Sequence, residues 1–180
     1  AKPYKIFTTK ADTKIGVIGL TAPYILTYPL LNWDIKLIQD MLHKSLKMVQ
    51  DENCDVIILL SHLGVSMDRL IAKKHPEIDV IVGSHTHHLF PKGEMDNGVL
   101  LAAAGKYGQH IGTINLEINE HKQITHKSAF TTKTETLKVE PGDEEWIKHQ
   151  FDEGEKLLNQ QQIANLPETL SCDYQAKHSI

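Results

Sequence analysis

The 180-residue sequence predicts an α/β fold, and two patterns carry that prediction. Two strand–loop–helix units follow one another before residue 83, which favours parallel strands joined by helical crossovers. From Val99 onward, apolar and polar residues begin to alternate, as they do in antiparallel strands with one exposed face. The length is sufficient for one domain with a hydrophobic core of its own.

The first half of the chain predicts three buried strands and two helices. Residues 14–21 are β-branched and almost all apolar, which is typical of a strand buried on both faces, and an irregular Pro- and aromatic-containing segment follows. Residues 34–50 have helical spacing, with Asn32 or Asp34 available as the N-cap. We expect further strands at 55–60 and 79–82, and between them a helix at 66–74 capped by Ser66. The apolar face of the first helix consists of Ile35, Ile38, Leu42, Leu46 and Val49.

The second half predicts an apolar strand beginning at Val99 and then a β-hairpin. Residues 110–120 alternate apolar and polar side chains, residues 124–137 do so less regularly, and residues 119–122 form the predicted turn. Pro141, Gly142 and Asp143 mark a break, after which residues 144–162 read as a solvated helix. The remaining residues have no clear period.

Composition excludes some kinds of partner. A net charge of −4, with 41% hydrophobic and 23% charged residues, argues against a broad nucleic-acid or anionic-membrane surface, so we expect neither partner. No apolar run approaches the roughly 20 residues that span a bilayer. The chain begins without Met or an apolar signal region, which suggests a sequence entered midway, and we expect a cytoplasmic protein. Cys54 adjoins an apolar run and is predicted to be a buried thiol, although a disulfide with Cys172 stays open.

Histidines follow two of the predicted strands. His85 and His87 stand in the run IDVIVGSHTHH, and His62 stands in DVIILLSHLG. Alternate residues of an extended chain point to one side, so His85 and His87 are expected to aim at neighbouring positions. Parallel strands would bring His62 to the same sheet edge, where sites in open α/β sheets usually lie. A polar loop facing solvent is the alternative, but three converging imidazoles favour a metal site.

The motifs SHLG, GSHTHH and NGVLLAAAGKYGQHIG resemble those of the calcineurin-like metallophosphoesterases, and most closely the bacterial 5′-nucleotidase / 2′,3′-cyclic phosphodiesterase branch. The resemblance runs from about residue 14 to about residue 137. It implies the back half of a four-layer α/β/β/α sandwich over residues 1–138, followed at 139–180 by a linker helix and the start of another domain. The implied function is hydrolysis of a small-molecule phosphate ester, in particular a nucleotide.

The resemblance also implies two divalent metal ions of manganese, zinc or iron. His62 and His85 would bind one ion and His87 the other, and a hydroxide between the ions would attack phosphorus. Groups near Ser61, Ser84 and Thr86 would orient the rings. Gly105, Lys106 and Tyr107 would hold the last core strand beside the site, and no catalytic or substrate-binding residue is assigned.

The sequence departs from the family in lacking the D-x-H, G-D-x-x-D and G-N-H-D/E motifs, which in the family precede the histidine motifs. The only Gly-Asp pair, Gly142-Asp143, lies downstream of them. We therefore expect the longer protein to be the enzyme, while this chain alone binds at most one ion. Two alternatives stay open: an inactive fragment that binds metal or a partner and can self-associate, and a thiosulfohydrolase-type enzyme on the same scaffold.

Overall fold

The computed structural model describes residues 3–34 and 36–159 of the chain. The chain divides into two compact units, residues 1–137 and 138–180. The first unit contains every strand that the described residues form and has the mixed α/β architecture that the sequence predicts. No helix among the described residues is long and apolar enough to cross a membrane.

A six-stranded sheet organises the first unit, with the strand order β1-β2-β3-β4-β6-β5. The four central strands are mutually parallel, as the two strand–loop–helix units predict, and an antiparallel strand closes each edge. The predicted strands at 14–21, 55–60 and 79–82 are thereby confirmed to within two residues. The strands are β1 (Tyr4–Thr8), β2 (Lys14–Thr21), β3 (Val56–His62), β4 (Val80–Gly83), β5 (Glu94–Asp96) and β6 (Val99–Ala102).

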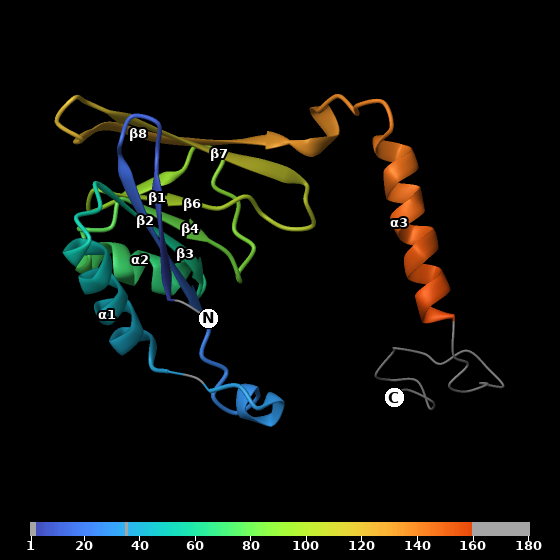
Figure 1. Cartoon of the computed structure of the whole chain (residues 1–180), viewed down its shortest axis with the longest axis horizontal. Coiled ribbons are helices and arrows are strands. Elements are labelled where there is room, and N and C mark those ends of the chain that lie inside the picture. The colour runs from blue at the N-terminus through green and yellow to red at the C-terminus, as the bar shows by residue number, and fades with distance from the viewer. Residues whose placement is uncertain (1–2, 35, 160–180) are drawn as a thin grey trace. The chain divides into compact units, whose positions relative to one another are not determined.

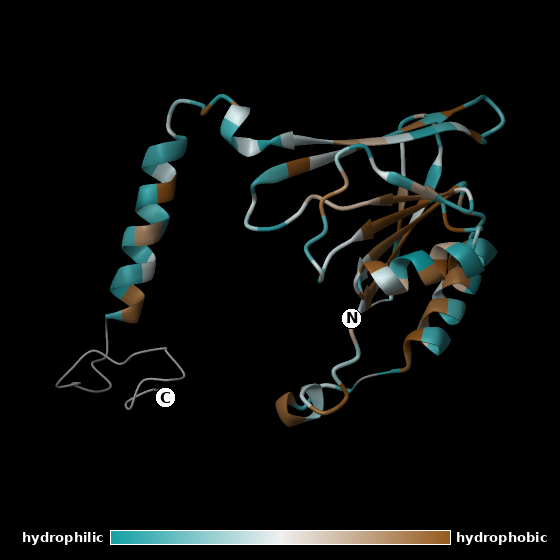
Figure 2. Ribbon diagram, turned by 180° about the vertical axis from the view of Figure 1, so that it is seen from behind, coloured by the Kyte–Doolittle hydropathy of each residue, from teal (hydrophilic) through white to brown (hydrophobic). Residues whose placement is uncertain are grey.

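Helices α1 (Ile38–Asp51) and α2 (Val65–Lys74) cover one face of this sheet (Figure 1). Three members of the predicted apolar face of α1, Leu42, Leu46 and Val49, are packed in the main core. Ile38 is half-buried at the start of the helix, and Ile35 lies outside the described residues. Ile18, Leu59 and Ile81 of the central strands complete that core, and Figure 2 shows apolar residues concentrated on these strands. Burial of these side chains is the main stabilising contribution to the unit.

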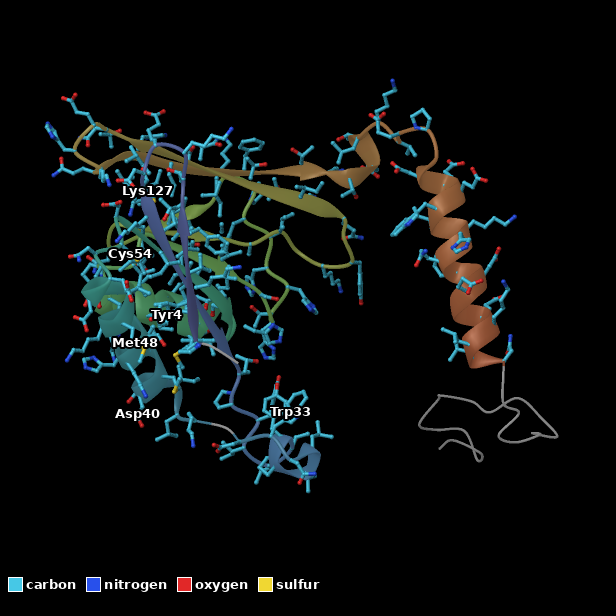
Figure 3. All side chains as sticks on the ribbon, in the orientation of Figure 1. Tyr4, Trp33, Asp40, Met48, Cys54 and Lys127 are labelled. Atoms are coloured by element: carbon cyan, nitrogen blue, oxygen red, sulfur yellow. The ribbon has the colours of Figure 1, made fainter. Side chains whose placement is uncertain are left out.

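A hairpin of β7 (His110–Ile118) and β8 (Ile124–Lys133) covers part of the opposite face. Val80, Leu100 and Ala129 form a second, smaller core between hairpin and sheet. Lys127 of β8, labelled in Figure 3, fixes this packing, because its ammonium lies 2.9 Å from Asp79 Oδ1 and 3.0 Å from the Gly98 carbonyl oxygen. The first unit thus contains three layers, helices, sheet and hairpin, in the order α/β/β.

The hairpin leaves the β1–β3 part of the same sheet face open. Leu60 of β3 is 48% exposed, and its neighbour in β2, Gly19, has no atom within 4 Å of where a Cβ would stand. Phe7 of the edge strand β1 is also about half exposed. His62, two residues after Leu60, lies on this same face because strand side chains alternate.

Both helix caps predicted from local sequence are wrong. Helix α1 begins at Ile38, four residues after its predicted start at 34, and its N-cap is Leu37, whose apolar side chain cannot cap. Asn32 instead ends the short 3₁₀ helix η1 (Tyr28–Leu31) in a left-handed conformation, and the Asp34 carboxylate pairs with Lys36 at 2.6 Å. The N-cap of α2 is Gly64 rather than Ser66. Its first amide, that of Val65, donates to the hydroxyl of Thr86 at 3.1 Å, so a residue 21 positions away takes the place of a local cap.

Cys54 is half-buried next to Gly16 and forms no disulfide within the part of the chain that the structure describes. Burial is the main cause that raises the pKa of its thiol. Cys172, the possible disulfide partner, lies outside the described residues.

The second unit is described up to residue 159 and contains α3 (Asp143–Leu158). Three acidic residues in its first turn, Asp143, Glu144 and Glu145, suit the positive end of the helix dipole. The helix begins one residue before its predicted start, and the last predicted residues, 160–162, lie outside the described part.

Candidate metal centre

Three adjacent parallel strands end at one edge of the sheet and bring polar side chains together there. His62 is the last residue of β3, and in the register it lies opposite Thr21, the last residue of β2. Gly83, the last residue of β4, lies opposite Ser61 of β3. His85 therefore follows two residues after the end of the strand next to the one that carries His62. Parallel strands thus bring His62 and His85 to one edge of the sheet, as the sequence predicts.

His62 and His85 form a close pair. His62 Nε2 lies 3.3 Å from His85 Nδ1, and the ring centroids are 4.9 Å apart at an interplanar angle of 71°. The other nitrogen of each ring faces a hydroxyl: His62 Nδ1 lies 3.3 Å from Ser84 Oγ, and His85 Nε2 lies 3.3 Å from the Tyr24 hydroxyl. Each imidazole therefore has one nitrogen turned to the other ring and one turned to a hydroxyl.

The backbone of the GSHTHH loop is not extended, which corrects the expectation that His85 and His87 are alternate residues of an extended chain. Both have positive φ, 63° and 56°. The Thr86 amide donates to the Ser84 carbonyl oxygen at 2.7 Å, which closes a γ-turn around His85. Such conformations cost about 1–3 kcal/mol in non-glycine residues and cluster at functional sites.

Thr86 joins this loop to α2. Its hydroxyl oxygen accepts the Val65 amide and also lies 2.9 Å from His88 Nδ1. Gly64 makes room for the contact: a Cβ there would stand 3.0 Å from Thr86 Cγ2 and 3.4 Å from His85 Cδ2, and its φ of 93° also favours glycine. The SHLG glycine thus allows the two histidine loops to approach each other.

Asp68 of α2 lies beneath both strand ends and is only 4% exposed. The Ser61 hydroxyl donates to Asp68 Oδ1 and accepts the Leu63 amide at 3.3 Å, which fixes the end of β3 directly beside His62. Burial raises the pKa of Asp68, and the Ser61 hydrogen bond opposes that rise. Gly83 lies against the other carboxylate oxygen, since a Cβ there would stand 2.7 Å from Oδ2.

The structure brings together two of the three predicted ligands. Within residues 3–34 and 36–159, no three His, Cys, Asp or Glu side chains converge on one point that could hold an ion, so the role of His87 stays a prediction. Tyr107 is 82% exposed with Lys106 Nζ 4.7 Å above its ring, and the contribution of this segment to the site also stays a prediction.

Sequence reasoning missed Tyr24 and Asp68. Asp68 could have been found from the sequence, because it falls on the apolar face of α2 with Val65, Ile71 and Ala72. A carboxylate on a buried face needs a hydrogen-bond partner. Tyr24 could not have been found in this way, because it lies in an irregular segment and reaches His85 from 61 residues away.

Comparison with protein-family models found no match. Among curated proteins, the chain is 39% identical over 130 residues to an uncharacterized metallophosphoesterase, YunD of Bacillus subtilis, covering 72% of this chain and 28% of that protein. It is 36% identical over 104 residues to the trifunctional nucleotide phosphoesterase protein YfkN of the same organism, a match that covers 56% of this chain and 7% of that protein. Bovine 5′-nucleotidase is 29% identical to the chain over 143 residues, a match that covers 68% of this chain and 25% of that protein. The chain therefore spans little more than a quarter of the length of these relatives, or less.

Solved structures share the fold. A 5′-nucleotidase precursor from Thermus thermophilus superposes with a TM-score of 0.66 at 21% identity, over 90% of this chain and 36% of that one. The sulfate thiohydrolase SoxB, also of Thermus thermophilus, has a TM-score of 0.70 at 20% identity, over 86% and 29%. The resemblance seen in the sequence is confirmed: the chain covers part of a calcineurin-like metallophosphoesterase domain of the 5′-nucleotidase branch.

Proposed function

We propose that the longer protein containing this chain is a metal-dependent phosphoester hydrolase of the nucleotide phosphatase type, with His62, His85 and His87 as metal ligands. The observation that carries the proposal is the 3.3 Å separation of His62 Nε2 and His85 Nδ1 at the carboxyl edge of the parallel sheet. The relatives named as phosphoesterases support the reaction class.

The histidine pair fits a shared ion. Two nitrogens each about 2.0–2.1 Å from one ion lie about 2.9–3.4 Å apart, depending on whether the angle at the ion is octahedral or tetrahedral. The separation of 3.3 Å falls in this range. Imidazole suits zinc, manganese and iron alike, so the donor type leaves these three as candidates.

The chemistry that bound ions supply in such sites is to lower the pKa of a coordinated water and to stabilise charge on phosphate oxygens. The residues of this chain hold the ligands in place: Ser84 and Tyr24 contact the outer ring nitrogens, and Asp68 supports the end of β3 through Ser61. His87 is proposed as the ligand of a second ion. Holding two dications close together requires carboxylates from elsewhere in the longer protein.

The open part of the sheet face, formed by Phe7, Gly19 and Leu60, is the proposed contact surface for that remaining part of the domain. It is apolar, it adjoins His62, and the relatives are several times longer than this chain. When the chain is alone, the same surface is expected to drive self-association. Residues 1–138 and 139–180 are proposed as the metallophosphoesterase portion and the linker to a further domain.

A thiosulfohydrolase-type reaction is the second candidate, because the sulfate thiohydrolase SoxB shares the fold. At 20% identity that likeness concerns the fold alone, whereas the relatives at 39% and 36% identity are named phosphoesterases. Phosphoester hydrolysis is therefore the better supported of the two.

The test is hydrolysis of an aryl phosphate and of nucleoside monophosphates by the longer protein with Mn²⁺. His85→Ala is expected to lower kcat/KM by about 100-fold or more, since ion-mediated stabilisation contributes several kcal/mol. His121→Ala is the matched control, because His121 is exposed on the hairpin turn and is expected to leave activity unchanged. Retained activity in His85→Ala would overturn the ligand assignment.

A further inference from the structure

Tyr24 lies three residues after the end of β2, the strand next to the one that carries His62. Its hydroxyl is 3.3 Å from His85 Nε2, the nitrogen that points away from His62. The ring is 45% exposed, so burial alone gives little reason for its position. Three neighbouring strand ends, not two, therefore contribute to the candidate metal centre.

The backbone around Tyr24 is tied to the site. The Ala22 amide donates to the His62 carbonyl oxygen at 3.0 Å, which continues the β2–β3 ladder one step beyond Thr21. The Tyr24 carbonyl oxygen then accepts amides from Thr27 and Tyr28, both at 3.0 Å. The Tyr28 ring packs edge-on against Tyr24, with centroids 5.5 Å apart. These contacts hold the phenol at the rim of the histidine pair.

A hydroxyl at this place determines which nitrogen of His85 can bind a cation. A neutral imidazole carries one N–H, and only the other nitrogen has a lone pair to offer. If Nε2–H donates to the Tyr24 oxygen, the lone pair of Nδ1 faces His62 Nε2. The Ser84 hydroxyl lies 3.3 Å from His62 Nδ1 and can donate to it or accept from it. In the metal-free protein His62 Nε2–H can therefore donate to the His85 Nδ1 lone pair, 3.3 Å away. When His62 instead takes the Nδ1–H tautomer, its own Nε2 lone pair faces the same gap between the rings.

We propose that Tyr24 is a positioning residue of the metal centre, whose hydroxyl holds His85 in the Nε2–H tautomer and thereby presents Nδ1 to the ion. The effect of Tyr24 on metal binding rests on the proposed function. The tautomer of His85 is a property of the metal-free protein and does not. Outer hydrogen bonds of this kind fix the tautomer and orientation of ligating histidines in general.

The experiment uses the longer protein and Tyr24→Phe, which removes the hydroxyl and keeps the ring. Long-range ¹H–¹⁵N spectra of the metal-free protein, at a pH where both rings are neutral, report the tautomer of His85. Titration with Co²⁺, followed by calorimetry and by its visible absorption, reports affinity. Tyr28→Phe is the control, because Tyr28 lies in the same segment and packs on Tyr24, so it tests for a general disturbance of that segment.

We expect the Nε2–H tautomer of His85 in the wild-type protein, a mixture in Tyr24→Phe, and a 10- to 100-fold loss of Co²⁺ affinity in that variant alone. The Nδ1–H tautomer in the wild-type protein would overturn the inference even if Tyr24→Phe failed to fold. Equal Co²⁺ affinity and an unchanged tautomer in Tyr24→Phe would also overturn it. A wild-type protein that shows the expected tautomer but binds no Co²⁺ would count against the proposed function and leave the tautomer result standing.

Discussion

Gly83 ends β4 between the buried Asp68 carboxylate and the loop that carries His85, and replacing it by alanine measures how tightly this region is packed. The added Cβ would stand 2.7 Å from Asp68 Oδ2, closer than real Cβ contacts occur. Asp68 cannot move away freely, because it is 4% exposed and is held by the Ser61 hydroxyl. The strain must therefore shift either α2 or the strand end.

The expected cost follows from two effects. Overpacking a well-filled interior costs about 1–3 kcal/mol, and weakening a hydrogen bond to a charged group costs about 1.5–3 kcal/mol when it is lost completely. Because the side chain relaxes partly, we expect Gly83→Ala to lower the free energy of unfolding by about 2–4 kcal/mol. With an m-value of about 2 kcal/mol/M in urea, the unfolding midpoint falls by about 1–2 M.

Urea unfolding followed by circular dichroism measures this cost, with Gly19→Ala as the control. Gly19 is also a strand residue, but a Cβ there meets no atom within 4 Å, so its substitution is expected to change stability by no more than about 0.5 kcal/mol. In Gly83→Ala/Asp68→Ala the clash is absent, so the combined loss should be smaller than the sum of the single losses. Additive losses, or a Gly83→Ala midpoint equal to that of the wild type, would refute the steric reasoning.

Two further predictions concern Asp68 of α2 and Leu60 of β3. Burial raises the pKa of Asp68, so the folded state binds the carboxyl proton more firmly than the unfolded state does. The stability that this proton contributes is therefore present below the ordinary pKa of 3.8 and is lost as pH rises through the raised pKa of the folded state. The stability of the wild type minus that of Asp68→Asn should therefore fall as pH increases in urea titrations, and a difference that rises or stays flat would contradict the assignment. Leu60→Lys should shift the isolated chain toward monomer in sedimentation velocity, because it places a charge on the open sheet face. A wild-type chain that stays monomeric at every concentration would remove the basis for that expectation.

Local sequence patterns predicted the four parallel strands, the hairpin and the three helices, since their periodicities depend on neighbouring residues. The apolar stripe of α1 and the alternation in β7 and β8 are examples. Local patterns did not predict the short edge strand β5, and they placed the start of α1 four residues too early. Helix caps failed where the partner is distant: the first amide of α2 is satisfied by Thr86, which no local motif around Ser66 could indicate. The cap of α1 failed because Asn32 is used to end η1.

The part of the candidate site that depends on strand order alone was predictable from the sequence. Parallel order brings His62 and His85 to one edge, and the structure confirms that they meet. The left-handed backbone at His85 and His87 was not predictable, because non-glycine residues adopt positive φ only when surrounding contacts impose it. The hydroxyl of Tyr24 was not predictable either, since its approach depends on how an irregular segment folds back over the sheet edge.

Because three strand ends meet at the histidine pair, binding of a cation there affects how the three strands unfold. His62 and His85 are 23 residues apart, and Tyr24 and His85 are 61 apart, so their arrangement exists only while β2, β3 and β4 are aligned. A cation that binds this arrangement binds the folded state alone and stabilises it by about 2.7 kcal/mol at one hundred times its dissociation constant. Amide hydrogen exchange should then slow throughout the three strands as a single cooperative unit, and the loops that contact the ion should show no separate protection.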